Sequence, residues 1–93
     1  MEIKIDSIEK RIEAKENEKT IGYVVFEEYE DYIDVYHTFV DIKLRGKGIA
    51  NELFNKTIEF ANEKNKKILP SCSYFRKKFE DHPEKYKDLE KIL

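Results

Sequence analysis

The chain has 93 residues, of which 40% are hydrophobic and 41% charged, and its net charge at pH 7 is −2. This length allows one small domain with a single core, and the slightly negative charge argues against a general nucleic-acid-binding protein. No apolar run approaches the roughly 18 residues of a membrane helix, and the N-terminus lacks a signal-peptide core, so we expect a cytoplasmic protein without membrane contacts. The single cysteine and two histidines predict neither an internal disulfide nor a structural metal.

The N-terminal part predicts β-structure. Residues 2–15 show weak β alternation, and residues 16–19 form a polar turn. Residues 20–27 are rich in β-branched and aromatic side chains and are apolar on both faces apart from Gly22. This pattern favours a central strand that is covered on two sides.

A second strong strand is expected over residues 33–40, after a turn at residues 28–32. Period-two alternation predicts that one face of it carries Ile33, Val35, His37 and Phe39. His37 is therefore expected in an apolar row.

The best helix of the sequence is expected from about Gly48 to Lys64, after a loop at residues 41–47. Its apolar positions follow helical spacing and consist of Ile49, Leu53, Phe54, Thr57, Ile58 and Ala61. We expect this stripe to pack on the sheet.

The C-terminal part predicts one short strand and two helices. Residues 67–69 form a strand that ends at Pro70 and, after the helical crossover, pairs in parallel with strand 33–40. A helical segment follows that carries Phe75 and Phe79, and His82-Pro83 ends it. Pro83 then suits the first turn of a last helix. Its apolar side is expected to consist of Tyr86, Leu89 and Leu93.

The loop between the second strong strand and the main helix predicts an anion site. Gly46 and Gly48 allow the backbone to approach a ligand, and the first turn of a helix presents unpaired N–H groups and a positive dipole end. Lys43, Arg45 and Lys47 add cations. The alternative is that the glycines only start the helix, since neither a P-loop nor a dinucleotide-binding motif is present.

The order of the elements, with Arg45-x-x-Gly48-x-Ala50 between strand and helix, resembles the GNAT superfamily of N-acetyltransferases. The resemblance implies a minimal α/β fold with a mixed antiparallel and parallel sheet, a main helix after the loop, and C-terminal helices. It also implies that acetyl-CoA binds here as co-substrate through its pyrophosphate. The binding residues would be Val40, Arg45, Gly46, Lys47, Gly48, Ile49, Ala50 and Asn51.

The resemblance extends to a branch of very small GNAT-like domains. Its pattern of H-T-E-V, R-G-K-G-I-A, P-x-C-x-Y and H-P-E-Y is similar to segments at residues 37–40, 45–50, 70–74 and 82–86. Phe39 stands where that pattern has a glutamate, and Lys85 is inserted before the last tyrosine. The first difference removes a carboxylate that would serve as general base or bind the acceptor.

Three residues are candidates for catalysis. Cys72 follows the short strand, where a thiol would take the acetyl group as nucleophile or protonate departing CoA; alternatively it is an inert buried cysteine. Tyr74 is the other candidate acid, because the resemblance places a tyrosine acid nearby; alternatively it is only an aromatic residue at a helix start. His37 would deprotonate an amine, although its apolar row favours a core histidine.

Two groups of charges are candidates for ligand contacts. A negative patch would attract a cationic acceptor or form a solvated hairpin turn, and comprises Glu27, Glu28, Glu30, Asp31 and Asp34. A basic group would reach the 3′-phosphate of CoA, or only flanks Phe75 and Phe79 without any ligand, and comprises Arg76, Lys77 and Lys78.

Together these features predict an acetyl-CoA-dependent N-acetyltransferase that acts on a primary amine of a small molecule or a protein lysine. The alternatives are a CoA-binding or protein-interaction module without turnover, and an α/β scaffold with no ligand. We expect a monomer or a weak homodimer.

Overall fold

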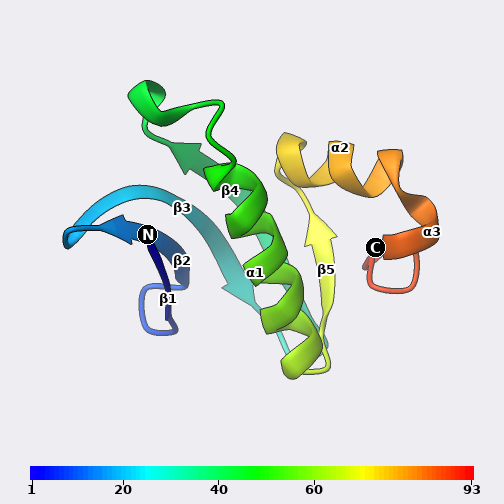
Figure 1. Cartoon of the computed structure of the whole chain (residues 1–93). Coiled ribbons are helices and arrows are strands. Elements are labelled where there is room, and N and C mark those ends of the chain that lie inside the picture. The colour runs from blue at the N-terminus through cyan, green and yellow to red at the C-terminus, as the bar shows by residue number, and fades with distance from the viewer.

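One five-stranded sheet forms the centre of the computed structural model, which describes all residues 1–93 (Figure 1). The strands lie in the order of the sequence: β1 (Glu2–Asp6), β2 (Arg11–Glu16), β3 (Lys19–Glu28), β4 (Tyr32–Val40) and β5 (Lys67–Pro70). The first four strands are antiparallel, and β5 pairs in parallel with β4. The predicted mixed sheet and the parallel pairing after the crossover are confirmed.

The helices follow the predicted order. A short 3₁₀ helix, η1 (Ile42–Leu44), leads to α1 (Ile49–Glu63), and α2 (Ser73–Asp81) and α3 (Pro83–Tyr86) come after β5. In Figure 1, α1 lies across one face of the sheet, and α2 and α3 lie on the far side of β5 from β1. None of these helices is long and apolar enough to cross a membrane.

The hydrophobic core lies between α1, α2 and one face of the sheet. Its sixteen buried residues are Ile12, Ala14, Ile21, Val24, Phe26, Ile33, Val35, Ile49, Leu53, Phe54, Phe60, Ala61, Ile68, Cys72, Phe75 and Phe79. Gly22 lets α1 approach β3 closely, since a Cβ there would lie 3.3 Å from side-chain atoms of both Ile49 and Leu53. The start of α1 is thereby held against the sheet.

The sheet is covered on one face only, which corrects the prediction for residues 20–27. Val24 and Phe26 are fully buried, whereas Tyr23 and Val25 are half-buried and Glu27 is exposed. An apolar residue on the second face therefore does not require a second layer, because many apolar atoms stay at protein surfaces.

A register shift in β4 corrects the prediction that Ile33, Val35, His37 and Phe39 share one face of the strand. Val35 pairs with Phe26, but His37 pairs with Val25, so one extra residue, Tyr36, is inserted in β4. Such a bulge reverses the alternation. Ile33 and Val35 are fully buried, whereas His37 and Phe39 are exposed. His37 is not a core histidine.

Two smaller differences concern the helices. Phe60 lies in the core and Ile58 is only partly buried, so the stripe of α1 is rotated slightly from the predicted one. The last helix is a single turn that ends at Tyr86, and Leu93 is 84% exposed. Tyr86 and Leu89 do pack against the core, as predicted.

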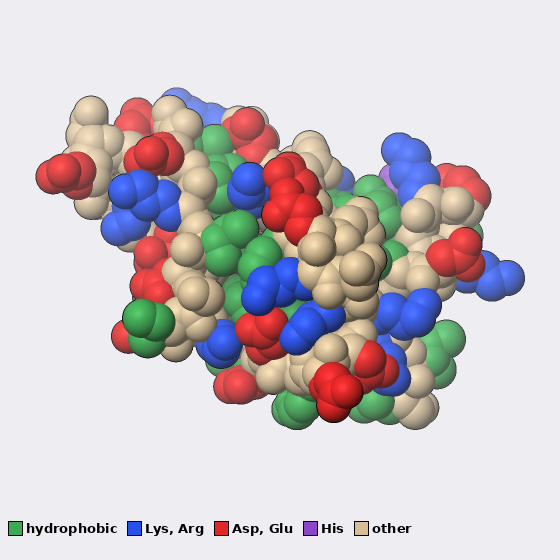
Figure 2. Space-filling view, turned by 90° about the horizontal axis from the view of Figure 1, so that it is seen from below, with side chains coloured by type: hydrophobic (Ala, Val, Ile, Leu, Met, Phe, Trp, Pro, Cys, Tyr) green, Lys and Arg blue, Asp and Glu red, His purple; other side chains and the backbone are tan.

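The carboxylate of Glu28 links separate segments of the chain at the C-terminal end of α1. Glu28 accepts hydrogen bonds from Lys10 at 3.0 Å, Lys64 at 3.2 Å and Lys66 at 2.8 Å. These bonds, with Lys66 contributing most, lower the pKa of Glu28 from 4.5 to about 2. Figure 2, which views this lower end, shows Lys and Arg side chains next to Asp and Glu. We call this the lysine-bound end.

Candidate functional site

The loop after β4 has a backbone that requires glycine. The side chain of Asp41 accepts a hydrogen bond from the amide of Lys43 at 3.0 Å and so starts η1. Gly46 and Gly48 then have φ values of 83° and 82°, a left-handed region that other residues rarely adopt. Gly48 is the N-cap of α1, so the helix begins at Ile49, one residue after the predicted start.

Seven consecutive backbone amides at the start of α1 have no acceptor within the chain. None of the N–H groups of residues 45–51 donates to a carbonyl or a side chain. The next amide, that of Glu52, donates to Gly48 O at 3.1 Å. Free amides at a helix N-terminus favour an anion, because the helix dipole adds a partial positive charge. The backbone therefore fits the predicted phosphate site.

A lysine of α2 reaches the same helix start. Lys78 Nζ donates to Asn51 Oδ1 at 2.7 Å, and the ammonium lies 5.4 Å from the ring centre of Phe54. The sequence placed Lys78 among three candidate cations, and the structure separates them. Arg76 donates to Ser71 O at 3.3 Å and Lys77 pairs with Asp81 at 3.1 Å, so both serve other contacts.

Strands β4 and β5 stop pairing next to this loop. Their last paired residues are Val35 and Pro70, and the amide of Cys72 adds one more bond, to Val35 O at 2.8 Å. Beyond this point β4 carries its bulge and continues to Val40, whereas β5 gives way to α2. The backbone thus opens between the two parallel strands beside the start of α1.

Cys72 and Tyr74 lie on the helix-covered side of this opening. Cys72 is 8% exposed, and its Sγ lies 3.2 Å from Thr38 Oγ1, within hydrogen-bond distance. Tyr74 packs edge-on against Phe54 with ring centres 6.3 Å apart, and burial raises the pKa of its hydroxyl. Tyr74 therefore keeps its proton at neutral pH, as an acid must.

His37 is not brought together with these two residues. It pairs with Val25 on the uncovered face of the sheet, and its ring lies 6.0 Å from that of Tyr23. Thr38, which was not predicted, contacts Cys72 instead. No pattern in the sequence signals this exchange, because the inserted residue in β4 decides which side chains point to the helices.

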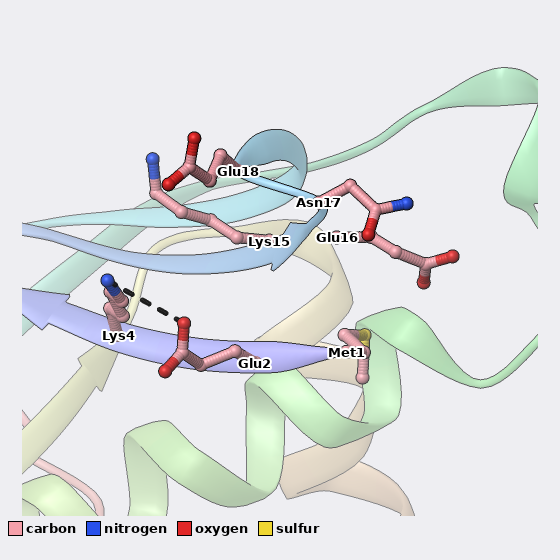
Figure 3. A pocket seen from close by; sticks show the side chains of 7 residues that line it. All are labelled: Met1, Glu2, Lys4, Lys15, Glu16, Asn17 and Glu18. Atoms are coloured by element: carbon pink, nitrogen blue, oxygen red, sulfur yellow. Dashed lines mark ion pairs between the residues drawn. The ribbon is translucent and has the colours of Figure 1, made fainter.

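The largest hollow of the surface lies elsewhere. It has a volume of about 530 Å³ and is lined by Met1, Glu2, Lys4, Lys15, Glu16, Asn17 and Glu18. Figure 3 shows these side chains at the start of β1, at the end of β2 and on the turn that follows β2, with Glu2 and Lys4 paired at 3.6 Å. Acids and bases are mixed there, so the hollow favours neither sign of ligand.

Comparison with known proteins identifies the family. Residues 11–89 match the family model described as GCN5-related N-acetyl-transferase. The chain belongs to this family. A GCN5-like protein of Staphylococcus aureus, solved by NMR, shares 28% identity and a TM-score of 0.69; the match covers 99% of this chain and 89% of that one. No protein with a curated description matches the sequence.

Two larger structures show the same fold. A GNAT family acetyltransferase of Elizabethkingia anophelis with acetyl-CoA bound shares 25% identity over 62% of this chain, with a TM-score of 0.57. A ribosomal-protein-alanine N-acetyltransferase of Brucella melitensis biovar Abortus 2308 shares 22% identity over 89% of it, with a TM-score of 0.58. The chain spans only 39% and 62% of these two proteins.

Proposed function

We propose that this protein is an acetyl-CoA-dependent N-acetyltransferase that transfers acetyl to a primary amine. The observation that supports it most is the run of seven unpaired amides at residues 45–51, beside the opening between β4 and β5. Membership of the GCN5-related N-acetyl-transferase family supports the reaction class.

The residues present fit the co-substrate. The amides of residues 45–51 would hold the pyrophosphate, with Arg45, Lys47 and Lys78 as nearby cations. Lys78 already lies at the helix start through its bond to Asn51. Val40 ends the strand that leads into this loop, and it packs against the core.

Acetyl-CoA would supply an acetyl group activated as a thioester. In the transfer a C–N bond forms to the neutral amine and the C–S bond breaks; the amine nitrogen loses one proton to a base, and the CoA sulfur takes one proton. Tyr74 is one candidate source of this proton, because its half-buried hydroxyl stays protonated at neutral pH. Cys72 is the other candidate, either as an acid or as a nucleophile that carries the acetyl group before the amine takes it.

The alternative function is a CoA-binding module without turnover. Phe39, at the position where the small GNAT-like pattern has a glutamate, lies 5.1 Å from the ring of Tyr23 and provides no carboxylate. His37 lies on the same face and is the candidate base if the protein does turn over. Binding and turnover must therefore be measured separately.

Calorimetry with acetyl-CoA and a thiol-release assay with a panel of amines test the proposal. Lys78→Met should weaken acetyl-CoA binding about three- to tenfold, because one cation leaves the helix start. Lys77→Met is the matched control, since Lys77 pairs with Asp81 and should leave affinity unchanged. Unchanged affinity in Lys78→Met would place the phosphate elsewhere, and binding without thiol release from any amine would favour the alternative.

We also propose that the protein is cytoplasmic and a monomer or weak homodimer, with residues 1–93 forming one domain. Sedimentation at several concentrations checks the oligomeric state.

A further inference from the structure

Thr38 and Cys72 form the one side-chain hydrogen bond between β4 and the segment that follows β5. Thr38 Oγ1 lies 3.2 Å from Cys72 Sγ, and neither atom has another hydrogen-bond partner in the chain. Both residues come after the last paired residues of the two strands, which are Val35 and Pro70. The side-chain bond thus crosses the opening beyond the point at which backbone pairing stops.

The backbone holds both residues in place around this bond. The amide of Cys72 donates to Val35 O at 2.8 Å, and its carbonyl accepts from the amide of Arg76 at 2.9 Å. Thr38 pairs with Val24, which is fully buried, so the Thr38 side chain points to the helix side of the sheet. A threonine side chain is also stiff at χ1. The hydroxyl of Thr38 is therefore a fixed group beside the sulfur.

The bond between these two side chains depends on the charge of the sulfur. A neutral thiol is a weak donor and a weak acceptor, so the resting pair gains little. A hydrogen bond to an ionised acceptor is roughly twice as strong. Both roles considered for Cys72, nucleophile and acid, pass through its thiolate. A thiolate has no proton to give, so Thr38 must then be the donor.

The hydroxyl of Thr57 shows the purely structural use of such a group. Thr57 is fully buried and donates to Leu53 O at 2.8 Å, one turn back in α1. That carbonyl is present in every state of the folded protein. Thr38 has no carbonyl partner and contacts only the sulfur. Valine has a similar shape and would fill the same space, whereas only a hydroxyl can donate to a charged sulfur.

The start of α2 supports a negative charge at the same sulfur without bonding to it. Cys72 is the N-cap of α2, and the positive end of a helix dipole favours an anion. However, the side chain of Cys72 makes no hydrogen bond to the amides of the first turn. Thr38 Oγ1 is therefore the one side-chain donor at hydrogen-bond distance from this sulfur.

We propose that Thr38 is a positioning residue for acetyl transfer, whose hydroxyl donates to the charged sulfur of Cys72 and holds it at the opening between β4 and β5. This inference rests on the proposed function and adds a residue to it. In either role of Cys72, the proton that its thiol loses is matched by the one that the CoA sulfur gains. The proton that the amine gives to the base then restores the thiol. Because the bond strengthens as charge appears, it favours the transition state over the resting protein.

Alkylation of the full chain by iodoacetamide at pH 7, followed by mass spectrometry, tests this role without any acetyl transfer. Cys72 is the single cysteine, so each modified chain reports its sulfur. Thr38→Val should slow alkylation about three- to fivefold, because fewer thiolates form and the higher reactivity of each offsets only part of the loss. Thr38→Ser keeps the hydroxyl and should restore the parent's rate.

Thr57→Val is the matched control, because it removes a buried hydroxyl from the same core at a distance from the sulfur. It should lower the melting temperature and leave the alkylation rate of Cys72 unchanged.

Kinetics on a working amine give a second readout. Thr38→Val should lower kcat about tenfold with acetyl-CoA affinity nearly unchanged, the pattern of a group that acts in the transition state. Thr38→Ser should recover most of kcat. A merely structural threonine would instead lower the melting temperature without this split between kcat and affinity.

Three results would overturn the assignment. They are alkylation of Thr38→Val at the parent's rate, a slow rate that Thr38→Ser does not restore, and equal slowing in Thr57→Val. The proposed function is judged separately by turnover of the parent. A parent that acetylates no amine would refute the function, whereas alkylation that depends on Thr38 would still keep Thr38 as the donor to the sulfur. Turnover that Thr38→Val leaves unchanged would do the reverse.

Discussion

The two ends of α1 differ in how well their polar groups are paired. At the lysine-bound end, Glu28 binds three lysines from separate parts of the chain, and the pKa of its carboxyl group falls to about 2. At the other end, seven backbone amides have no acceptor and β4 and β5 have stopped pairing. One end is therefore built for stability, and the other carries groups that a ligand would satisfy.

The largest effect on acetyl-CoA binding is expected when proline replaces Gly48 and removes the left-handed backbone conformation at the start of α1. Proline cannot adopt the φ of 82° that Gly48 has, and it removes one amide, so Gly48→Pro should weaken acetyl-CoA binding at least 100-fold, about 2.7 kcal/mol. Calorimetry measures this loss. Binding as tight as in the parent would show that the amides of residues 45–51 are not the anion site.

Changing Cys72 should affect turnover more than binding. We expect Cys72→Ala to lower kcat at least tenfold with acetyl-CoA affinity nearly unchanged, the pattern of a group that acts in the transition state. Mass spectrometry after incubation with acetyl-CoA separates the two roles, because only the nucleophile gains an acetyl group. Full turnover on a working amine would leave Tyr74 as the better acid.

A substitution at the lysine-bound end should change the stability of the fold and leave acetyl-CoA affinity unchanged. The pKa of Glu28 is lowered by folding, so its contribution is present above about pH 4.5 and is lost as the pH falls toward 2. Glu28→Gln should lower the free energy of unfolding by about 1 to 2 kcal/mol at pH 7, allowing for solvent screening, and by less at pH 3. Denaturant titrations at both pH values measure this, with acetyl-CoA affinity as the control.

An equal loss at the two pH values would mean that the charge of Glu28 contributes nothing. A loss of acetyl-CoA affinity in this variant would mean that the two ends of α1 are coupled rather than separate.

Local signals were enough to predict most of the fold. The apolar spacing of Leu53 and Phe54 predicted α1, Gly48 predicted its start, and His82-Pro83 predicted the break between the last two helices, because each acts through nearby backbone geometry. The loop 45–51 was predicted for the same reason. The cover expected on the second face of residues 20–27, over Val25, was wrong, since an apolar side chain does not report what covers it.

The tertiary structure decided which side chains face one another. The inserted residue in β4 moved His37 to the face of the sheet that no helix covers and brought Thr38 to Cys72. Lys78 was one of three similar cations until the packing of α2 on α1 brought it to Asn51. The sequence by itself determined where strands, loop and helices lie, because those depend on neighbours in the chain. The site depends on register and packing between distant segments, which no local pattern encodes.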